Sequence, residues 1–145
     1  PFVNEAIHQI LQARDDVYFV FAQTPPFISH HKVKFLQPFA DLDRKRKFIN
    51  TADAMIHARL IGESFGMACA EYSHCNKPII TFDGSPEKNH ISVLGEKGIY
   101  YDGIQQVFDI LKNFKKEPEK DWNAYKDFTP EKVMTKFDEV FLSKI

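Results

Sequence analysis

The segment AMIHARLIGESFGMACAEYSHCNKPIITFD, residues 54–83, contains the pattern that decides the fold. It begins with the short apolar run AMIHA (54–58) and ends with a second one, PIITF (78–82), and both favour β-strands. Between them a loop leads into GMACAE, a run of small residues that suits a slim helix. A strand, a helix and a second strand in this order predict a pair of parallel strands joined by a crossover helix.

The same alternation continues on both sides of this segment. It predicts strands over 17–22, 33–36, 54–58, 78–82 and 98–102, and helices over 2–13, 42–51, from about 65, over 104–114 and over 130–142. The predicted fold class is α/β, a Rossmann-like, doubly wound, mostly parallel sheet with helices on both faces. We expect residues 1–117 to form this domain and residues 118–145 to form a helical tail that packs on it.

Composition narrows the range of partners. The 145 residues suffice for one domain with its own core, and a formal net charge of -1 argues against nucleic acid or an anionic membrane as partner. No apolar run approaches the roughly 20 residues that cross a bilayer. Cys69 and Cys75 are six residues apart, which on a helix separates their Cα atoms by roughly 9 Å, too far for a disulfide. Reduced thiols predict a cytoplasmic protein.

Two glutamates, Glu63 and Glu71, bracket the start of the central helix. With Ser64 as the N-cap, the helix would begin near Phe65 and Gly66, and its unpaired N–H groups would form an anion site suited to phosphate. Gly66 would let a ligand approach the backbone closely. Glu71 would then lie roughly 9 Å further along the helix axis, about the distance from a diphosphate to a ribose, where a carboxylate can accept two hydroxyl hydrogen bonds.

The segment from Glu63 to Glu71 resembles the E-x7-E motif of retaining glycosyltransferases of the GT-B fold, the family 4 type. Two further segments fall in the expected order: NKPIITFDGSPE resembles the segment that follows the motif in this family, and EKGIYYD resembles the next strand. The resemblance covers about residues 6–114. It implies that the chain is the C-terminal, donor-binding half of such an enzyme, which transfers a hexosyl group from a nucleotide diphosphate sugar to a hydroxyl acceptor with retention.

The resemblance also implies roles for individual residues. Glu71 would hold the ribose hydroxyls of a sugar nucleotide, and Glu63, the candidate catalytic residue, would contact hydroxyls of the donor sugar. Ser64, Phe65, Gly66 and Met67 would line the donor site, the last three through backbone N–H groups. The family implies no metal and no cofactor, because positive side chains and the helix dipole stabilise the departing phosphate.

The chain departs from the family pattern at its beginning, where the family has a first strand with a G-R pair and a Lys that grip the diphosphate. The chain opens at the following helix instead. Arg59 and Lys88 are candidate substitutes, although solvated charges are the simpler interpretation. His57, Gly84 and His90 lie where they would approach the sugar or the nucleotide. We expect the missing N-terminal GT-B domain, a partner chain or a second copy in a homo-oligomer to complete the sheet and the cleft.

Other interpretations remain open. The chain is a stand-alone, non-catalytic nucleotide-binding or interaction module if it functions without a second half, and half of a sugar-nucleotide epimerase if both halves supply acid and base groups. As one half of a two-domain glycosyltransferase, the isolated chain would be inactive. Cys69 lies among alanines with no base identifiable, which argues against a nucleophile. The adjacent His30 and His31 lack further ligands at metal spacing, so we expect no metal. The sequence leaves the base, the sugar and the acceptor open.

Overall fold

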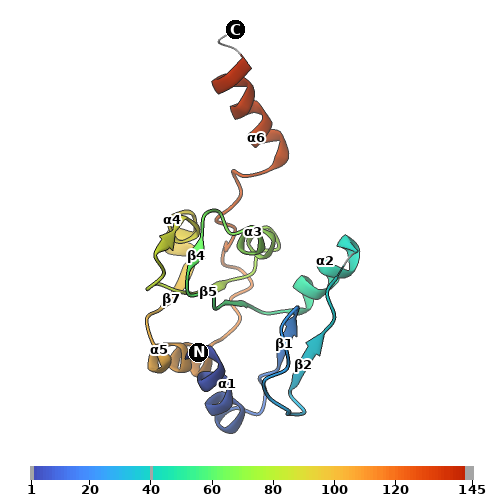
Figure 1. The fold of residues 1–145 in the computed structure, drawn as a ribbon, viewed down its shortest axis with the longest axis vertical. Helices are drawn as coiled ribbons and strands as arrows, with labels where there is room; N and C mark the ends of the chain where they lie inside the picture. Colours follow the sequence, from blue (N-terminus) through green and yellow to red (C-terminus); the bar gives the residue numbers. More distant parts are fainter. Residues whose placement is uncertain (1, 40, 143–145) are drawn as a thin grey trace. The chain divides into compact units, whose positions relative to one another are not determined.

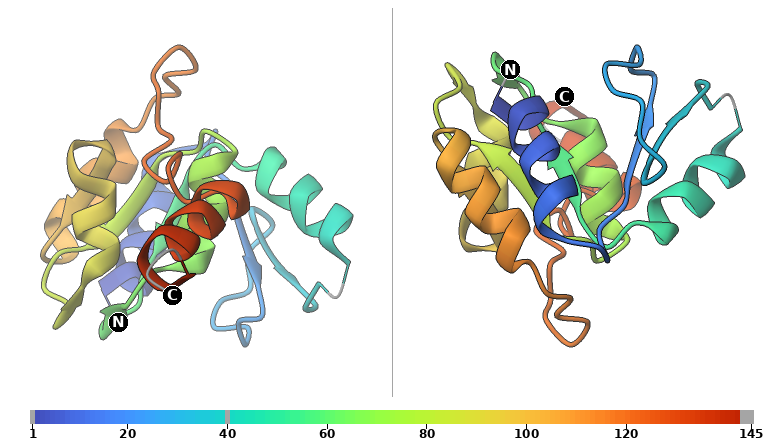
Figure 2. Two further views of the ribbon diagram at one scale, coloured as in Figure 1. Left: turned by 90° about the horizontal axis from the view of Figure 1, so that it is seen from above. Right: turned by 90° about the horizontal axis from the view of Figure 1, so that it is seen from below.

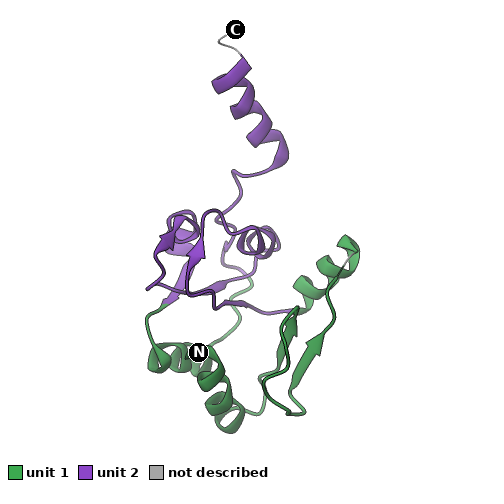
Figure 3. Cartoon of the chain, in the orientation of Figure 1, with its two compact units in different colours: residues 1–51, 101–118 green, residues 52–100, 119–145 purple. Residues whose placement is uncertain are grey.

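The computed structural model describes residues 2–39 and 41–142 and divides the chain into two compact units (Figures 1 and 3). Unit 1 consists of residues 1–51 and 101–118, and unit 2 of residues 52–100 and 119–145. Each unit therefore contains two separate stretches of the chain. The boundary that the sequence predicts at residue 117 stays a prediction.

Unit 1 combines three helices with one pair of strands. Its elements are α1 (Phe2–Ala13), β1 (Phe19–Ala22), β2 (Val33–Leu36), α2 (Leu42–Thr51) and α5 (Ile104–Asn113). Helices α1 and α5 lie side by side (Figure 2), because each presents an apolar face on which Ile7, Ile10 and Val107 are fully buried. The Arg14 guanidinium fixes their ends by donating to the backbone carbonyls of Leu111 and Phe114, each at 3.0 Å.

The two strands of unit 1 run parallel, with Phe19 opposite Val33. On this pair the rings of Phe21 and Phe35 stack with centroids 5.1 Å apart, and Phe27 contacts both rings edge-on. Such edge-on and stacked contacts are the arrangements that aromatic rings prefer. Aromatic packing therefore supports a sheet of only two strands.

Unit 2 contains the segment that decides the fold. Its elements are β3 (Met55–His57), β4 (Gly62–Glu63), α3 (Met67–His74), β5 (Ile79–Phe82), β6 (Glu87–Lys88), α4 (Asn89–Leu94), the 3-10 turn η1 (Gly95–Lys97), most of β7 (Gly98–Tyr101), α6 (Pro130–Phe137) and the π-helical turn η2 (Asp138–Leu142). The main sheet has the order β3-β5-β7, and β3 runs parallel to β5 with Ile56 opposite Ile80. Helix α3 connects these two strands and packs on both.

A compact apolar cluster holds α3 against the sheet. Cys69 of α3, Ile79 of β5, Leu94 of α4 and Tyr125 of the C-terminal segment are each at most 2% exposed. Because Tyr125 belongs to this cluster and Trp122 is also buried, this part of the C-terminal segment contributes to the core of unit 2, whereas α6 and η2 bury no residue.

The α/β class with parallel strands is confirmed. The predicted helices over 2–13 and 42–51 and the strand over 33–36 have the bounds that the sequence indicated, and Pro130 begins α6 as expected, behind the N-cap Thr129. Over residues 2–39 and 41–142, no helix is long and apolar enough to cross a membrane.

Candidate functional site

The segment from Glu63 to Glu71 lies within unit 2, where it begins in β4 and ends in α3 (Figure 1). Strand β4 pairs with β6 in parallel, so that Gly62 faces Glu87 and Glu63 faces Lys88. This close pairing requires glycine at position 62, which has a φ of 81° and where a Cβ atom would lie 1.9 Å from the Glu87 carbonyl oxygen. The pairing brings Glu63 beside the end of the GSPE segment.

Glu63 is held through one oxygen of its carboxylate. Oε1 accepts a hydrogen bond from Arg59 Nη1 at 2.9 Å and lies 3.4 Å from His57 Nε2. Within the part of the chain that the structure describes, Oε2 accepts no hydrogen bond. One oxygen of Glu63 is thus anchored, and the other can accept from a ligand.

The surroundings of Glu63 keep its carboxyl group ionised. Partial burial by itself raises the pKa of Glu63, but the hydrogen bonds from Arg59 and His57 outweigh it, and the pKa lies below its usual value. An ionised carboxylate accepts hydrogen bonds and donates none. Its natural ligands are therefore hydroxyl or amine groups.

Behind Glu63 lies a buried row of polar side chains. His57 Nδ1 is 3.0 Å from Thr81 Oγ1, which is 3.2 Å from His90 Nε2. Burial lowers the pKa of both histidines, although the carboxylate of Glu63 opposes this at His57 and its backbone opposes it at His90. Both rings are therefore neutral at pH 7. The sequence singled out the two histidines but missed Thr81, because a threonine in a buried strand carries no signal of its own.

Helix α3 begins at Met67, and its N-cap is Gly66 in the left-handed conformation (φ 81°, ψ 66°). The prediction that Ser64 caps the helix is therefore wrong: the left-handed turn at Gly66 redirects the chain, and Ser64 lies two residues too early to reach the first turn. No side chain among the described residues caps α3. Its first N–H groups thus remain unpaired by side chains, as an anion site requires.

The loop before α3 is fixed by a residue from the C-terminal segment. The hydroxyl group of Tyr125 donates to the backbone carbonyl of Phe65 at 2.7 Å, and the Phe65 ring contacts the rings of Tyr125 and Phe128 edge-on. A Cβ atom on Gly66 would lie 3.3 Å from the Tyr125 hydroxyl and 3.1 Å from the Cβ of His90, so glycine also fits this space best. Sequence reasoning assigned no role to Tyr125, since it lies 60 residues from its partner.

The remaining candidate residues are arranged as follows. Glu71 is the fifth residue of α3 and is half-buried, about 6 Å along the helix axis from Met67. Lys88 forms an ion pair with Asp83 at 3.3 Å, and both side chains are about half exposed. Gly84 is exposed beside the Phe82 ring. Arg59 and Lys88 thus each pair with a carboxylate in this structure.

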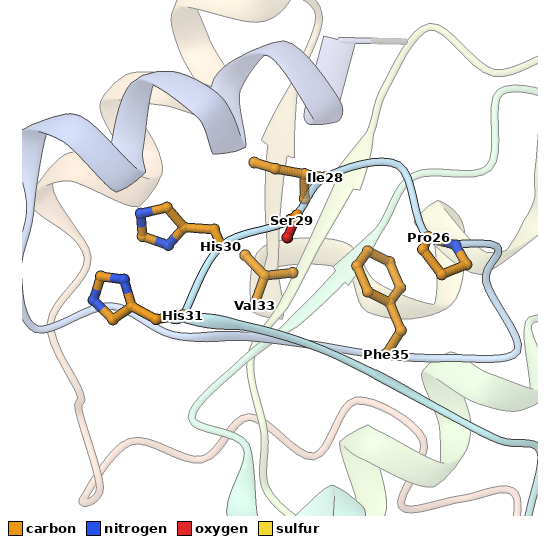
Figure 4. Close-up of a pocket in the computed structure, with 7 residues that line it drawn as sticks. All are labelled: Pro26, Ile28, Ser29, His30, His31, Val33 and Phe35. Atoms are coloured by element: carbon orange, nitrogen blue, oxygen red, sulfur yellow. The ribbon is translucent and has the colours of Figure 1, made fainter.

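Cys69 and the adjacent His30 and His31 are the two other candidates that the sequence raised. Cys69 is fully buried, and burial raises the pKa of its thiol to about 12, which agrees with its exclusion as a nucleophile. His30 and His31 line an open hollow of unit 1 (Figure 4) together with Pro26, Ile28, Ser29, Val33 and Phe35. Over the described residues no group of three His, Cys, Asp or Glu side chains is placed to hold a metal ion.

Comparison with known proteins gives one informative match. No family model matches the chain, and no curated protein matches its sequence. The fold is similar to the crystal structure of HepE from Anabaena in complex with UDP-glucose, with a TM-score of 0.64 and 15% sequence identity. The match covers 96% of this chain and 52% of HepE, so the chain spans about half the length of the protein that it resembles. The α/β fold of this chain thus resembles that of one half of HepE.

Proposed function

We propose that this chain is the donor-binding half of a retaining GT-B glycosyltransferase. The complete enzyme would transfer a hexosyl group from a nucleotide diphosphate sugar to a hydroxyl acceptor in the cytoplasm. The half that this sequence does not contain would supply the acceptor site, as an N-terminal domain or as a partner chain. The isolated chain would then bind donor but transfer little.

The observation that carries the proposal is the placement of Glu63. Its carboxylate is ionised and anchored through Oε1, and its Oε2 accepts no hydrogen bond from the described residues. It stands three residues before Gly66, the N-cap of a helix without a side-chain cap. A carboxylate that accepts hydrogen bonds from sugar hydroxyls, next to N–H groups that donate to a phosphate, is the combination that a sugar nucleotide needs.

Three further points support it. The segment Glu63–Glu71 has the spacing of the E-x7-E motif, with Ser64, Phe65, Gly66 and Met67 between the loop and the helix. Glu71, one turn into α3, would hold the ribose hydroxyls. The fold resembles half of HepE, which was crystallised with UDP-glucose. We therefore propose UDP-glucose as the first donor to test, with no metal or cofactor required.

The test is ligand-observed NMR of the chain with UDP, GDP, ADP and their glucose conjugates. In Glu71→Ala, loss of a charged hydrogen bond to ribose should cost about 1.5–3 kcal/mol, or roughly ten- to over a hundredfold in affinity. Glu96→Ala, an exposed glutamate of the same unit, is the matched control and should leave binding unchanged.

The outcomes separate the candidate functions. Binding of one nucleotide that Glu71→Ala removes supports the donor site and identifies the base. Binding that Glu71→Ala and Glu96→Ala leave equally intact contradicts the assignment of Glu71. If no nucleotide binds, the chain alone is not a donor site, and a non-catalytic interaction module becomes the better description.

A further inference from the structure

Four polar side chains of unit 2 form a continuous row behind the candidate sugar site. Glu63 Oε1 lies 3.4 Å from His57 Nε2, His57 Nδ1 lies 3.0 Å from Thr81 Oγ1, and Thr81 Oγ1 lies 3.2 Å from His90 Nε2. These residues come from β4, β3, β5 and α4, so four separate elements converge on the row. Thr81 and His90 are fully buried and His57 is 6% exposed. Water cannot replace the partners within this row.

The single proton of the Thr81 hydroxyl group limits how the row can be hydrogen-bonded. This group can donate one hydrogen bond, but a ring nitrogen of His57 and one of His90 both face it. When the hydroxyl proton is used within the row, one of these nitrogens accepts it, and the other carries a proton and donates to the hydroxyl oxygen. Only two arrangements of the whole row satisfy this condition when both rings are neutral.

The carboxylate of Glu63 selects between them. Because an ionised carboxylate only accepts, His57 must carry its proton on Nε2, and its Nδ1 must then accept from Thr81. The oxygen of Thr81 in turn accepts from Nε2–H of His90. This leaves Nδ1 of His90 as a bare acceptor, and that buried atom has no hydrogen bond of standard geometry among the described residues.

The reverse arrangement would direct a bare nitrogen of His57 at a carboxylate oxygen, which is repulsive. Its single advantage lies at the far end, where Nδ1–H of His90 would face the backbone of Glu63, the group that favours protonation of this ring. A hydrogen bond between an N–H group and a carboxylate is worth more than one to a neutral carbonyl. The first arrangement is therefore favoured.

We propose that Thr81 and His90 are positioning residues for Glu63, holding the His57 ring with its Nε2–H toward Oε1 so that Oε2 is presented in one orientation to a hydroxyl group of the donor sugar. The identity of the ligand rests on the proposed function. The hydrogen-bond row itself is a property of the free protein, and it is tested without any ligand.

The first experiment reads the tautomers directly, by long-range 1H–15N NMR of the 15N-labelled chain at pH 7. In the wild type both rings should carry the proton on Nε2. Thr81→Val removes the hydroxyl group at nearly constant shape, so Nδ1 of His57 should shift toward the value of an acceptor without a hydrogen bond, while Nε2 keeps the proton that it donates to Glu63. Thr81→Ser should restore the wild-type pattern, and Thr135→Val, at an exposed position of α6, should not change it.

The second experiment compares UDP-glucose with UDP. Thr81→Val should weaken UDP-glucose about two- to tenfold, the effect of one hydrogen bond, and should leave UDP unchanged. Thr81→Ser should restore the wild-type ratio of the affinities for UDP-glucose and UDP. A substitution that only destabilised the site would lower the affinities for UDP and UDP-glucose by equal factors.

The proposal is overturned if the wild-type His57 carries its proton on Nδ1, or if Thr81→Val leaves the Nδ1 resonance of His57 unchanged. It is also overturned if Thr81→Val weakens UDP and UDP-glucose equally. If the wild type binds neither ligand, the proposed function fails, but the tautomers and the titration of the Glu63 carboxyl carbon in Thr81→Val still decide whether the row positions Glu63.

Discussion

The hydroxyl group of Tyr125 donates a hydrogen bond of 2.7 Å to the backbone carbonyl of Phe65, and thereby joins the C-terminal segment to the loop before α3. The ring of Tyr125 is fully buried, and burial raises the pKa of its hydroxyl group far above the usual value. The hydroxyl group is therefore protonated under all ordinary conditions. Because a trans peptide places its C=O and N–H on opposite sides, fixing the Phe65 carbonyl also fixes the direction of the Gly66 N–H.

Tyr125→Phe should therefore loosen the candidate site while leaving the core packed. Loss of one hydrogen bond and a less satisfied carbonyl should cost about 1–3 kcal/mol in the free energy of unfolding. Urea unfolding followed by fluorescence of Trp122, the single tryptophan, measures this for unit 2. Tyr18→Phe makes the same change at a side chain that is 66% exposed, and should be neutral within about 0.5 kcal/mol. Equal stability of Tyr125→Phe and Tyr18→Phe would contradict the role of this hydrogen bond.

Ser73 of α3 holds the same C-terminal segment at a second point. Its hydroxyl group donates to the Trp122 carbonyl at 3.2 Å and accepts from the N–H of Ala124 at 2.8 Å and of Tyr125 at 3.3 Å. Ser73→Ala removes all three hydrogen bonds and leaves the buried N–H of Tyr125 unpaired, whereas the N–H of Ala124 keeps the Trp122 carbonyl as its partner at 2.9 Å, so the substitution should cost about 1–3 kcal/mol.

The same substitution should also be visible in the native protein. Trp122 is 6% exposed, so its emission should shift to longer wavelength if residues 120–125 detach. Ser92→Ala, which removes an exposed serine that bonds the Lys88 carbonyl, is the control. An unchanged emission spectrum and unchanged stability in Ser73→Ala would show that the Ser73 hydroxyl group is not needed to hold the segment, which Asn76 also binds through Lys120 and Trp122.

The main elements of the fold were predictable because their signals are local. The β-forming runs around Ile56 and Ile80 and the apolar face of α1 are each visible within a dozen residues. Strands β4 and β6 were missed, since each has two residues and no periodicity to detect. Their pairing depends on Gly62, whose left-handed conformation is a property of the folded loop and is not distinguishable from other glycines in the sequence.

The candidate site was predictable only in part, for a related reason. The spacing of Glu63 and Glu71 is a sequence property, and so is their resemblance to a motif. The contacts that orient Glu63 join residues 4 to 24 positions apart, through Arg59, His57 and Thr81. The N-cap was misplaced because Ser64 is the preferred residue type for that position, whereas the left-handed turn at Gly66 decides where α3 begins.

Gly62→Ala should be among the most damaging substitutions in unit 2. It combines a φ of 81° with a Cβ atom that would lie 1.9 Å from a backbone oxygen, so β4 must separate from β6. Strain and overpacking together should cost about 3 kcal/mol or more. Two other glycines separate the backbone strain from the steric clash. Gly95 has a φ of 49° with open space around it, so Gly95→Ala tests strain alone and should cost about 1–2 kcal/mol. Gly103 has neither a positive φ nor a close neighbour, so Gly103→Ala is the control for both. If Gly62→Ala lowered the free energy of unfolding no more than Gly95→Ala does, β4 and β6 would have to separate easily.

The stability of unit 2 should fall as the pH drops from 7 to 5. The pKa values of His57 and His90 lie below 6.5 in the folded chain because burial disfavours the charged rings. Below about pH 6.5 the unfolded chain therefore binds protons that the folded chain does not, and the free energy of unfolding falls with pH. Each histidine contributes a slope of up to about 1.4 kcal/mol per pH unit. The carboxyl group of Glu63 adds to this only at lower pH, since its stabilising contacts are lost as it protonates below 4.5.

His90→Gln should reduce this slope, because an amide that does not titrate replaces one buried ring. Urea unfolding at pH 7.0, 6.0 and 5.2, followed by Trp122 fluorescence, compares the slopes independently of any loss of stability at pH 7. If the free energy of unfolding had the same slope against pH in the wild type and in His90→Gln, groups other than His90 would cause the pH dependence.

The two glutamates of the motif should respond differently to the same conservative change. Glu63→Gln keeps the shape of the side chain but removes the charge that a sugar hydroxyl would donate to, so the affinity for UDP-glucose should fall about tenfold and that for UDP should stay within twofold. Glu71→Gln should weaken UDP and UDP-glucose by equal factors, because both ligands carry the ribose.

The comparison is informative because neither change should unfold the protein. Arg59, which loses its partner in Glu63→Gln, has a side chain that is 58% exposed, and such an ion pair contributes at most about 1 kcal/mol. Calorimetric titration of both ligands against both variants gives four affinities from one design. A Glu63→Gln variant that loses UDP and UDP-glucose equally would place Glu63 at the nucleotide instead of the sugar, and the order of the donor along α3 would then have to be reversed.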